Sequence, residues 1–363
     1  MKTQDTKRNG RRRQLQRITV KDVAEAAGVS MMSVSNVIHN RAHVSDALRQ
    51  LVQEKIKELG YVPNRAAQEL AGVVRPHFAL LYPGVINPFI AAIIVGAMKA
   101  AERLKVDVSV QLAQIDDQKA LRETMQRLER EGIEGFLLPS PIAEFVASAY
   151  RQKPLSVPAV ALAPGTPLPG MASVRCDERQ AAIGLVSILI EAGHRHIGHL
   201  AGPVTQSGSV ARRQGYEIAL RTQGIEPKPE DIVVSPAYTF QEGVKAAEAL
   251  LDGNPKLTAV FAANDTLAAA VLAVAHRRNI PVPTAFSVVG YDDAPVAEQV
   301  WPGLSTVHQD APNMTEKAVE LLVEGVRAWK ADRSFKLVGD VVLPYRIIER
   351  GSVGQINAGE DLS

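Results

Sequence analysis

The chain has 363 residues, of which 46% are hydrophobic and 22% charged, an ordinary composition for a folded globular protein. No apolar run approaches the length of a membrane span, and no apolar segment follows the basic N-terminus as it would in a secretory signal. Because Cys176 is the single cysteine, an internal disulfide and a multi-cysteine zinc site are excluded, and we expect a cytoplasmic protein. The length is enough for one small and one large domain, or for three small ones.

The net charge of +2 is unevenly distributed along the chain. Residues 1–65 contain 13 Lys and Arg against 6 Asp and Glu, a net charge of +7, which leaves −5 for the remainder. A basic head on a mildly acidic body is typical of a DNA-binding domain attached to another domain. Residues 1–17 carry most of this charge without apolar periodicity. They predict a disordered basic arm that attracts phosphates non-specifically, or simply a solvated tail.

Residues 18–60 have the pattern of three short helices. Gly28 ends the first, Ser30 caps a second over Met31–Ile38, and Ser45 caps a third. The third helix is expected to bury Leu48, Leu51, Val52, Ile56 and Leu59. Two helices joined by a tight glycine turn and braced by a third predict a helix-turn-helix domain, whose second helix enters the DNA major groove. A protein-interaction module is the alternative, and the basic charge argues against it.

The next segment, Tyr61–Gly72, reads YVPNRAAQELAG. Pro63 suits a helix start and Gly72 a helix end, so the pattern predicts a helix of about two turns. A helix this short is marginal alone in water, because nucleation costs more than a few hydrogen bonds return. It should form only when something packs on it, and a plain interdomain linker is the alternative.

From residue 76 onward, short apolar runs alternate with amphipathic segments. The predicted strands are Phe78–Tyr82, Val106–Gln111, Gly135–Leu138, Pro158–Ala161, Ser173–Arg175, Ile197–Leu200, Ile232–Ser235, Ala259–Ala262 and Ser287–Tyr291. Alternating strands and helices predict an α/β fold with parallel sheets covered on both faces. The segment is too long for one sheet, so we expect two doubly wound lobes, with the ligand beyond the C-terminal ends of the strands.

These motifs together resemble the lactose/galactose repressor (LacI/GalR) family of bacterial regulators. The resemblance is carried by ITVKDVAEAAGVS, VSNVIHN and ELGYVPNRAAQELAG and continues through most of the chain. It implies a helix-turn-helix headpiece over 18–60, a hinge helix or linker over 61–75, a two-lobed periplasmic-binding-protein-like sensor over 76–350 and a tail over 351–363. It also implies that the chain crosses between lobes near residues 175, 307 and 335, which assigns 336–350 to the C-terminal lobe.

The family resemblance also implies which residues contact DNA. Met31, Met32 and Asn36 are the candidates to read bases, while Ser30, Ser33 and Ser35 position phosphates. Asn64, Arg65 and Leu70 are the hinge candidates, with Leu70 as a wedge between base pairs in the minor groove. Asn36 stands where the family most often has arginine, and methionines stand where polar or aromatic residues are common. Because asparagine pairs with adenine and arginine with guanine, the operator should differ from the usual family palindrome.

Polar and aromatic residues that follow the strands match positions lining the family's effector pocket. The candidates are Phe89, Asp177, Arg212, Tyr238, Asn264, Asp292 and Gln309. The set suits a sugar, nucleoside or sugar acid, although Ile90, where a second aromatic ring is common, argues against a flat heterocycle. Asp265 is interpreted as the N-cap of its own helix and is left out of the set.

Other chemistry is not supported by the sequence. His194, His196 and His199 invite a metal reading, but on a strand entrance the first two share one face and the third takes the other. The chain has no phosphate-binding GxxxxGK[ST] loop and no GxSxG nucleophile elbow, and the serines of Ser207–Ser209 have no evident base partner. We therefore expect no metal, no cofactor, no catalytic residue and no enzyme activity.

The sequence thus predicts a ligand-responsive transcription regulator. We expect a repressor that binds a pseudo-palindromic operator as a homodimer, controlled by a small sugar-like or sugar-acid effector and with no membrane contact. The segment 351–363 has no heptad leucines, so dimers are expected rather than tetramers. A sugar-binding transport protein, and a regulator that activates or needs a corepressor, are the alternatives.

Overall fold

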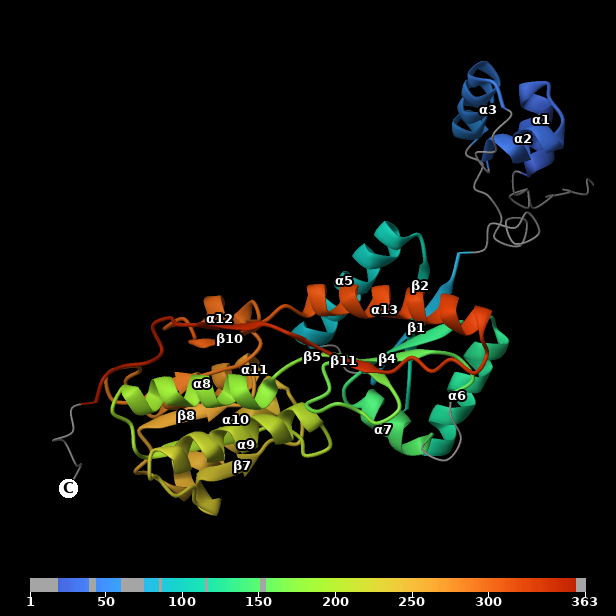
Figure 1. The fold of residues 1–363 in the computed structure, drawn as a ribbon. Helices are drawn as coiled ribbons and strands as arrows, with labels where there is room; N and C mark the ends of the chain where they lie inside the picture. Colours follow the sequence, from blue (N-terminus) through green and yellow to red (C-terminus); the bar gives the residue numbers. More distant parts are fainter. Residues whose placement is uncertain are drawn as a thin grey trace, which may run out of the picture. The chain divides into compact units, whose positions relative to one another are not determined.

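The computed structural model describes residues 19–38, 44–59, 75–84, 87–114, 117–150 and 155–356. The chain divides into two compact units, one ending at Arg75 and one beginning at Pro76, and each is described by itself (Figure 1). The predicted hinge residues Asn64, Arg65 and Leu70 lie outside the described residues. Within the described ranges, no helix is both long and apolar enough to cross a membrane.

The first unit contains three helices around a small apolar core. Thr19 and Asp22 form a capping box at the start of the first helix, and Gly28, with a φ of 68°, ends it. The helices are α1 (Val20–Ala27), α2 (Met31–Ile38) and α3 (Asp46–Leu59). Their core comprises Val23, Ala24, Ala27, Val34, Val37 and Val52. The prediction that Leu51 lies in this core is wrong, since its side chain is 39% exposed on the surface of α3.

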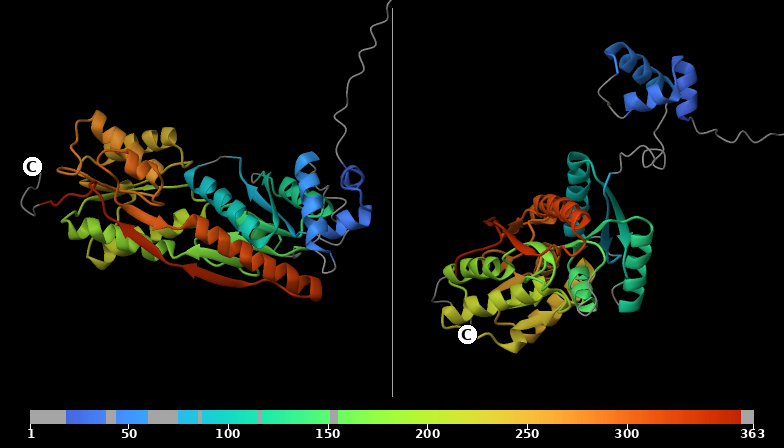
Figure 2. Two further views of the ribbon diagram at one scale, coloured as in Figure 1. Left: turned by 90° about the horizontal axis from the view of Figure 1, so that it is seen from above. Right: turned by 45° about the vertical axis from the view of Figure 1, so that its right-hand side comes forward.

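The second unit begins with an N-terminal lobe built on a parallel sheet of order β11-β5-β4-β3-β1-β2. Its strands are β1 (His77–Tyr82), β2 (Asp107–Leu112), β3 (Gly135–Pro139), β4 (Ala159–Leu162), β5 (Ala172–Cys176) and β11 (Gly339–Leu343). One face is covered by α5 (Pro88–Leu104) and α13 (Ala311–Ala331), and the other by α6 (Gln118–Arg130) and α7 (Ile142–Ala149) (Figures 1 and 2).

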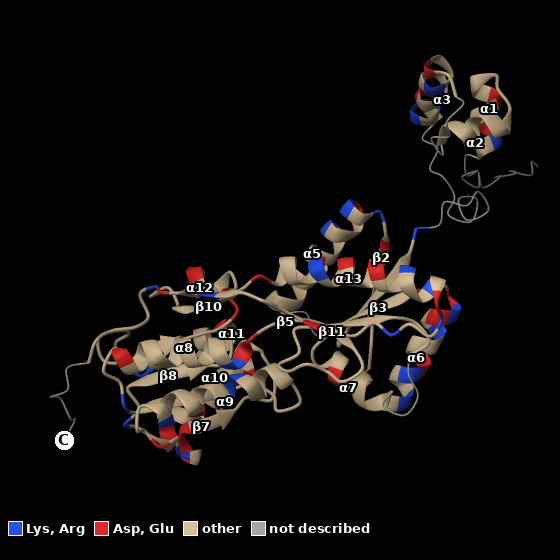
Figure 3. Cartoon of the chain, in the orientation of Figure 1, with Lys and Arg blue, Asp and Glu red and all other residues tan. Residues whose placement is uncertain are grey.

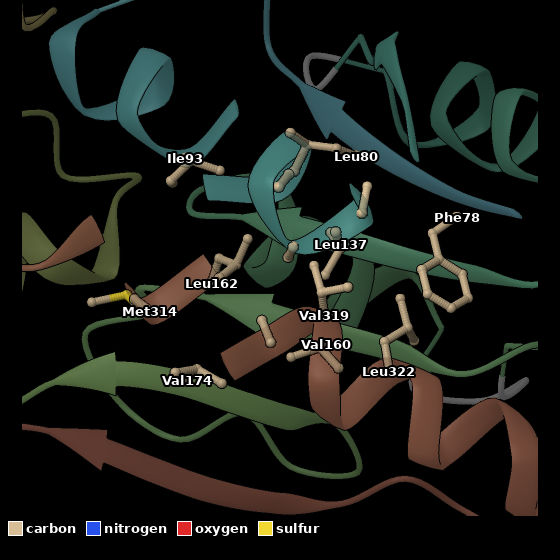
Figure 4. Close-up of a cluster of buried hydrophobic side chains, with 14 of the residues drawn as sticks. Phe78, Leu80, Ile93, Leu137, Val160, Leu162, Val174, Met314, Val319 and Leu322 are labelled. Atoms are coloured by element: carbon tan, nitrogen blue, oxygen red, sulfur yellow. The ribbon is translucent and has the colours of Figure 1, made fainter. Parts of the chain in front are cut away.

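The largest apolar cluster of this lobe lies between the sheet and the helices α5 and α13. Phe78, Leu80 and Leu137 from the strands meet Ile93 of α5 and Val319 of α13, all of them buried (Figure 4). Residues from helix α13, more than 180 positions away in the sequence, therefore complete the core that the first strands begin. Burial of such side chains is the main favourable term in folding.

The C-terminal lobe has a second parallel sheet of order β7-β6-β8-β9. Its strands are β6 (Ile197–Ala201), β7 (Ile232–Val234), β8 (Ala259–Ala262) and β9 (Ser287–Val289). Its helices are α8 (Glu178–Glu191), α9 (Ser207–Thr222), α10 (Phe240–Gly253), α11 (Asp265–Arg277) and α12 (Val296–Gln299), with a 3-10 turn at Pro229–Asp231. One face packs against α8 and α9 and the other against α10 and α11. The predicted α/β fold with two covered parallel sheets is confirmed.

The chain crosses between the lobes three times. It leaves the first sheet after β5, and it returns after β10 (Thr306–Gln309), which pairs antiparallel with β12 (Tyr345–Ile348). The third crossing was predicted near residue 335, and this is wrong. Strand β11 still belongs to the N-terminal sheet, where Gly339 pairs with Ala172. The crossing comes at Pro344, which has no N–H to continue the ladder.

Candidate functional site

In the first unit, helix α2 presents its first turn to solvent. The Ser33 amide donates a hydrogen bond of 3.0 Å to the Ser30 hydroxyl, which starts the helix as predicted. Val34 and Val37 face the core, whereas Met31 and Met32 are 57% and 67% exposed. Two large apolar side chains are therefore exposed at the start of this helix.

The remaining predicted base and phosphate contacts lie on the same helix. Ser30 is exposed, and Ser33, Ser35 and Asn36 are partly exposed. The arrangement has the geometry of a recognition helix, in which residues of the first turn approach base edges. The roles of these individual residues toward DNA stay predictions.

In the second unit, a cavity of about 290 Å³ lies between the two lobes. The N-terminal lobe contributes Asn87, Phe89, Ile90, Ser140, Pro141 and Ala163, among others. The C-terminal lobe contributes Glu178, Gln206, Ser209, Arg212, Tyr238, Asn264 and Asp292, among others. The lining joins loops and helix starts at the C-terminal ends of the strands, where open α/β sheets bind ligands.

Five of the seven predicted effector residues line this cavity: Phe89, Arg212, Tyr238, Asn264 and Asp292. The other two do not. Asp177 caps α8 by accepting a 3.0 Å hydrogen bond from the Gln180 amide, and the Gln309 amide donates a 2.7 Å hydrogen bond to Asp292 Oδ1. Gln309 therefore holds the carboxylate of Asp292, which lines the cavity, without lining the cavity itself. The effector role of all seven residues stays a prediction.

Arg212, in the second turn of α9, is the most highly connected side chain of the cavity. Its Nε donates to Glu178 Oε2 at 2.6 Å, its Nη1 donates to the Ala263 carbonyl at 2.6 Å, and its Nη2 lies 3.7 Å from Asp292 Oδ1. The guanidinium also stacks 3.8 Å from the centre of the Tyr291 ring. Burial opposes its charged form, but Glu178 and Asp292 outweigh burial and raise the pKa of Arg212 well above its usual value.

Glu178 is the charged lining residue that the sequence analysis missed. Its side chain is only 1% exposed, and it begins α8 directly after the predicted Asp177. The sequence carried a weak signal, because an acidic residue at a helix start reads first as a helix-end charge. Only the fold shows that Asp177 serves the helix while Glu178 faces the cavity.

Asp292 is held in an unusual backbone conformation, with a φ of 107°. Such a conformation costs about 1–3 kcal/mol in a residue other than glycine and persists where neighbours fix it. Here the Asp292 amide donates 2.9 Å to the Val307 carbonyl, and Gln309 holds the carboxylate. Burial raises the pKa of Asp292 to about 6, against the opposing influence of Arg212 and Gln309.

Aromatic side chains from both lobes border the polar groups. Phe89 lies in the first turn of α5, and Asn87 caps that helix with a 2.8 Å bond from the Ile90 amide. Tyr238 packs directly on Gly202, where an added Cβ would overlap the phenol ring. One aromatic residue per lobe beside fixed carboxylate, amide and guanidinium groups is an arrangement that binds a polyhydroxylated molecule.

Asp265 does not have the predicted role of N-cap, which is a correction. Asn264 caps α11, accepting a 2.9 Å bond from the Leu267 amide. Asp265 is instead buried beneath the cavity, where it accepts bonds from the Thr306 hydroxyl and the Ala294 amide, each 2.7 Å long. Burial, followed by the nearby Asp292, raises the pKa of Asp265 to about 8.

The three histidines do not form a metal site within the described part of the chain. His194 is buried and lies within 2.9 Å of the Thr258 hydroxyl and 2.8 Å of the Ser287 hydroxyl. His199 is also buried, but His196 is exposed, so the prediction that His194 and His196 share one face is wrong. The strand begins only at Ile197, and the alternation of faces does not apply before it.

Two family models match the sequence. Residues 19–64 match "Bacterial regulatory proteins, lacI family", and residues 186–353 match "Periplasmic binding protein-like domain". Among curated proteins, the chain is 34% identical over 350 residues to the HTH-type transcriptional regulator CelR of Thermobifida fusca. The match covers 92% of this chain and 95% of that protein.

Solved structures give the same picture. A transcriptional regulator CelR–cellobiose complex is 31% identical, with a TM-score of 0.67, over 93% of this chain and all of that one. A lac repressor bound to ONPG in the repressed state is 26% identical, with a TM-score of 0.78, over the same shares of the two chains. Head and sensor are therefore similar to those of DNA-binding regulators along nearly the whole length.

Proposed function

This chain belongs to the LacI family of bacterial regulatory proteins, which are DNA-binding transcriptional regulators. On that basis we propose that it is a repressor whose binding to operator DNA is weakened or strengthened by a small sugar. The head binds a pseudo-palindromic operator as part of a homodimer, and the cavity binds the effector. Such a protein works in the cytoplasm, where the DNA is.

The exposed first turn of α2 carries the DNA-binding part of this proposal. Met31 and Met32 are exposed outside the apolar core of the head, and their side chains suit contact with thymine methyl groups in the major groove. Asn36, one turn later, is able to pair with adenine. A transport protein or a plain sugar-binding protein would have no use for such a helix.

The cavity carries the effector part of the proposal. The relatives that share this fold include one solved with cellobiose and one solved with ONPG, and both ligands are sugars or sugar derivatives. Here Arg212, Asp292 and Asn264 offer charged and amide groups beside Phe89 and Tyr238, which are able to stack on a sugar face. A volume near the lower end of the roughly 300–1,000 Å³ of small-molecule sites favours a single sugar over a long oligosaccharide.

We also propose that the chain is not an enzyme. Ser207, one of the two serines considered as nucleophiles, is hydrogen-bonded to Glu144 and to the Gly165 amide, so its hydroxyl links the two lobes. The Glu144 carboxylate accepts hydrogen bonds from both Ser140 and Ser207. The proposal therefore rests on the use of the Ser207 hydroxyl in a contact between the lobes and on the family of DNA-binding regulators to which the chain belongs.

The test is selection of binding sites from a random duplex pool with the purified full-length chain, followed by a footprint. We expect enrichment of a palindrome with a flexible central step and with adenine at the position opposite Asn36. The sign of the effector's influence on operator affinity then separates an inducer from a corepressor. No enrichment, with and without small-molecule cell extract, would contradict the regulator proposal.

A further inference from the structure

Three charged residues line the cavity among those that the structure describes, namely Glu178, Arg212 and Asp292. With all three ionised, the cavity carries one net negative charge. Surface helices such as α6 also carry both signs, but water surrounds those charges (Figure 3). The side chains of Arg212 and Glu178 are only 9% and 1% exposed, so their charges are weakly screened and act strongly on a bound molecule.

The guanidinium of Arg212 is partly occupied by the protein. Of its five N–H groups, the one on Nε donates to Glu178 and one on Nη1 donates to the Ala263 carbonyl, while Nη2 lies 3.7 Å from Asp292 Oδ1. Arginine binds a carboxylate or phosphate most strongly through two parallel N–H bonds. An anionic ligand would gain that pair of bonds through Nε only by displacing Glu178, and through Nη1 and Nη2 it would lie close to the Asp292 carboxylate, whereas a hydroxyl group needs a single free N–H.

Helix starts around the cavity oppose this negative charge, since helix N-termini attract anions. Four of those starts already have a side-chain cap, from Asn87, Asp177, Thr239 and Asn264, and each cap accepts a hydrogen bond from one backbone N–H. The starts of α7 and α9 have no side-chain cap, but each has a carboxylate close by. Glu144 lies in the first turn of α7, and Gly208 in the first turn of α9 lies against Glu178, with 3.8 Å between the carboxyl carbon and an added Cβ. The fixed carboxylate therefore supplies the negative charge that this helix end favours.

We propose that Glu178 is a specificity-determining residue that makes the cavity selective for an uncharged sugar and excludes sugar acids and sugar phosphates. This inference rests on the proposed sugar effector and narrows its class. A ligand carboxylate beside Glu178 and Asp292 would be repelled in a poorly screened site, and Glu178 cannot turn away because it is buried against Arg212. A neutral sugar keeps the internal ion pairs intact and adds hydrogen bonds to them.

The test measures binding to the full-length chain by calorimetry and thermal unfolding, with matched neutral and charged probes. The pairs are glucose and glucuronate, galactose and galacturonate, and ribose and ribose 5-phosphate. The wild type should bind one neutral member at least about tenfold more tightly than its charged partner. Glu178→Gln keeps the shape and a hydrogen bond to Arg212, and it should raise affinity for the charged partner by about tenfold or more.

Glu178→Asp is the control that retains the charge, and it should still reject the charged partner. A charged probe that binds the wild type as tightly as its neutral partner would overturn the inference, as would a folded Glu178→Gln that gains no affinity for anions. If neither the wild type nor either variant binds any of the six probes, the sugar assignment is overturned and this inference with it. Operator binding, measured on the same preparations, would show whether the regulator proposal stands in each case.

Discussion

Buried titratable side chains of the C-terminal lobe are each fixed by a small number of partners. His199 stacks on Tyr216 and Phe261, with ring centres 5.0 and 4.7 Å apart, and its Nδ1 donates 2.9 Å to the Phe261 carbonyl. Its Nε2 is buried and has no hydrogen-bond partner among the described residues, so the neutral ring fits the site and the charged ring does not. Burial accordingly lowers the pKa of His199 to about 4.

This shift makes folding depend on pH in a defined direction. Between pH 6.5 and about 4, the unfolded chain binds a proton at His199 that the folded protein does not, so stability falls as the pH falls through this window. His199→Leu removes that contribution. Relative to the variant, the wild type should lose about 2 kcal/mol of unfolding free energy between pH 7.5 and pH 5.

Urea unfolding of both proteins at the two pH values measures this loss. Taking the difference between wild type and variant cancels the opposite contribution of Asp265. The raised pKa of that residue, about 8, means that its neutral form is favoured in the folded protein and that stability falls as the pH rises toward 8. A difference that does not change with pH would show that His199 is protonated inside the fold.

At the level of elements, the two long helices of the N-terminal lobe approach closely at a glycine. A Cβ added to Gly96 of α5 would lie 2.7 Å from the Pro312 carbonyl oxygen and 2.8 Å from its Cα, both backbone atoms of α13. Backbone cannot rotate away as a flexible side chain can. The contact is therefore set by the absence of a side chain at Gly96, and helix α13 would have to shift to admit one.

Gly96→Ala should destabilise the protein by about 1–3 kcal/mol, despite the better helix propensity of alanine. The matched control is Gly253→Ala, at the end of α10, where an added Cβ would meet its nearest neighbour only at 4.0 Å. This control should be neutral or slightly stabilising. Thermal unfolding of the three proteins compares them, and equal midpoints for the two variants would contradict close packing of α5 on α13.

Elements marked by local chemistry were predictable from the sequence, and those made by distant partners were not. The predicted bounds of the helix Met31–Ile38 are confirmed. They were predictable because the cap is local: the Ser30 hydroxyl accepts its hydrogen bond from the amide of Ser33, three residues later. Strands β10 and β12 were missed. They pair across nearly forty residues of sequence, and the residues of Thr306–Gln309 do not by themselves indicate which strand they pair with. The assignment of β11 failed for the same reason, since its partner is β5.

The cavity shows the same limit. Arg212, Tyr238, Asn264 and Asp292 were found from their places after strands and near helix starts. Glu178 was missed because adjacent residues at a helix start point in different directions, and sequence alone does not say which of Asp177 and Glu178 caps the helix. Periodicity likewise placed Leu51 inward on α3, although the small head leaves that face of the helix open to solvent.

At the scale of the whole sensor, the lobes meet through a hydrogen-bonded bridge beside the cavity. The Ser207 hydroxyl, at the start of α9, donates to Glu144 of α7 and accepts a 2.7 Å bond from the Gly165 amide. Glu144 also accepts a 2.8 Å bond from Ser140, and its second carboxyl oxygen is buried with no partner in the described part of the chain. Gly165 has no room for a Cβ, which would overlap the backbone at Ser207. The bridge favours the arrangement in which both lobes contact one ligand.

Ser207→Ala removes this bridge and tests whether the lobes carry the regulatory signal. Losing a net hydrogen bond of about 0.5–1.5 kcal/mol should weaken binding of the neutral sugar roughly two- to tenfold by calorimetry. Ser187→Ala is the control, because its hydroxyl bonds only to the Ile183 carbonyl within α8. It should leave the affinity for the sugar unchanged.

Operator affinity of the ligand-free Ser207→Ala protein supplies the sharper readout. A ligand acts on DNA binding only through its different affinities for the lobe arrangements. If the sugar favours the bridged arrangement, the mutation must move operator affinity in the direction opposite to the sugar, whichever direction that is. A sugar that weakens operator binding therefore requires a variant that binds the operator more tightly than the wild type. Movement in the same direction would show that the signal reaches the head by a route other than the Ser207–Glu144 bridge.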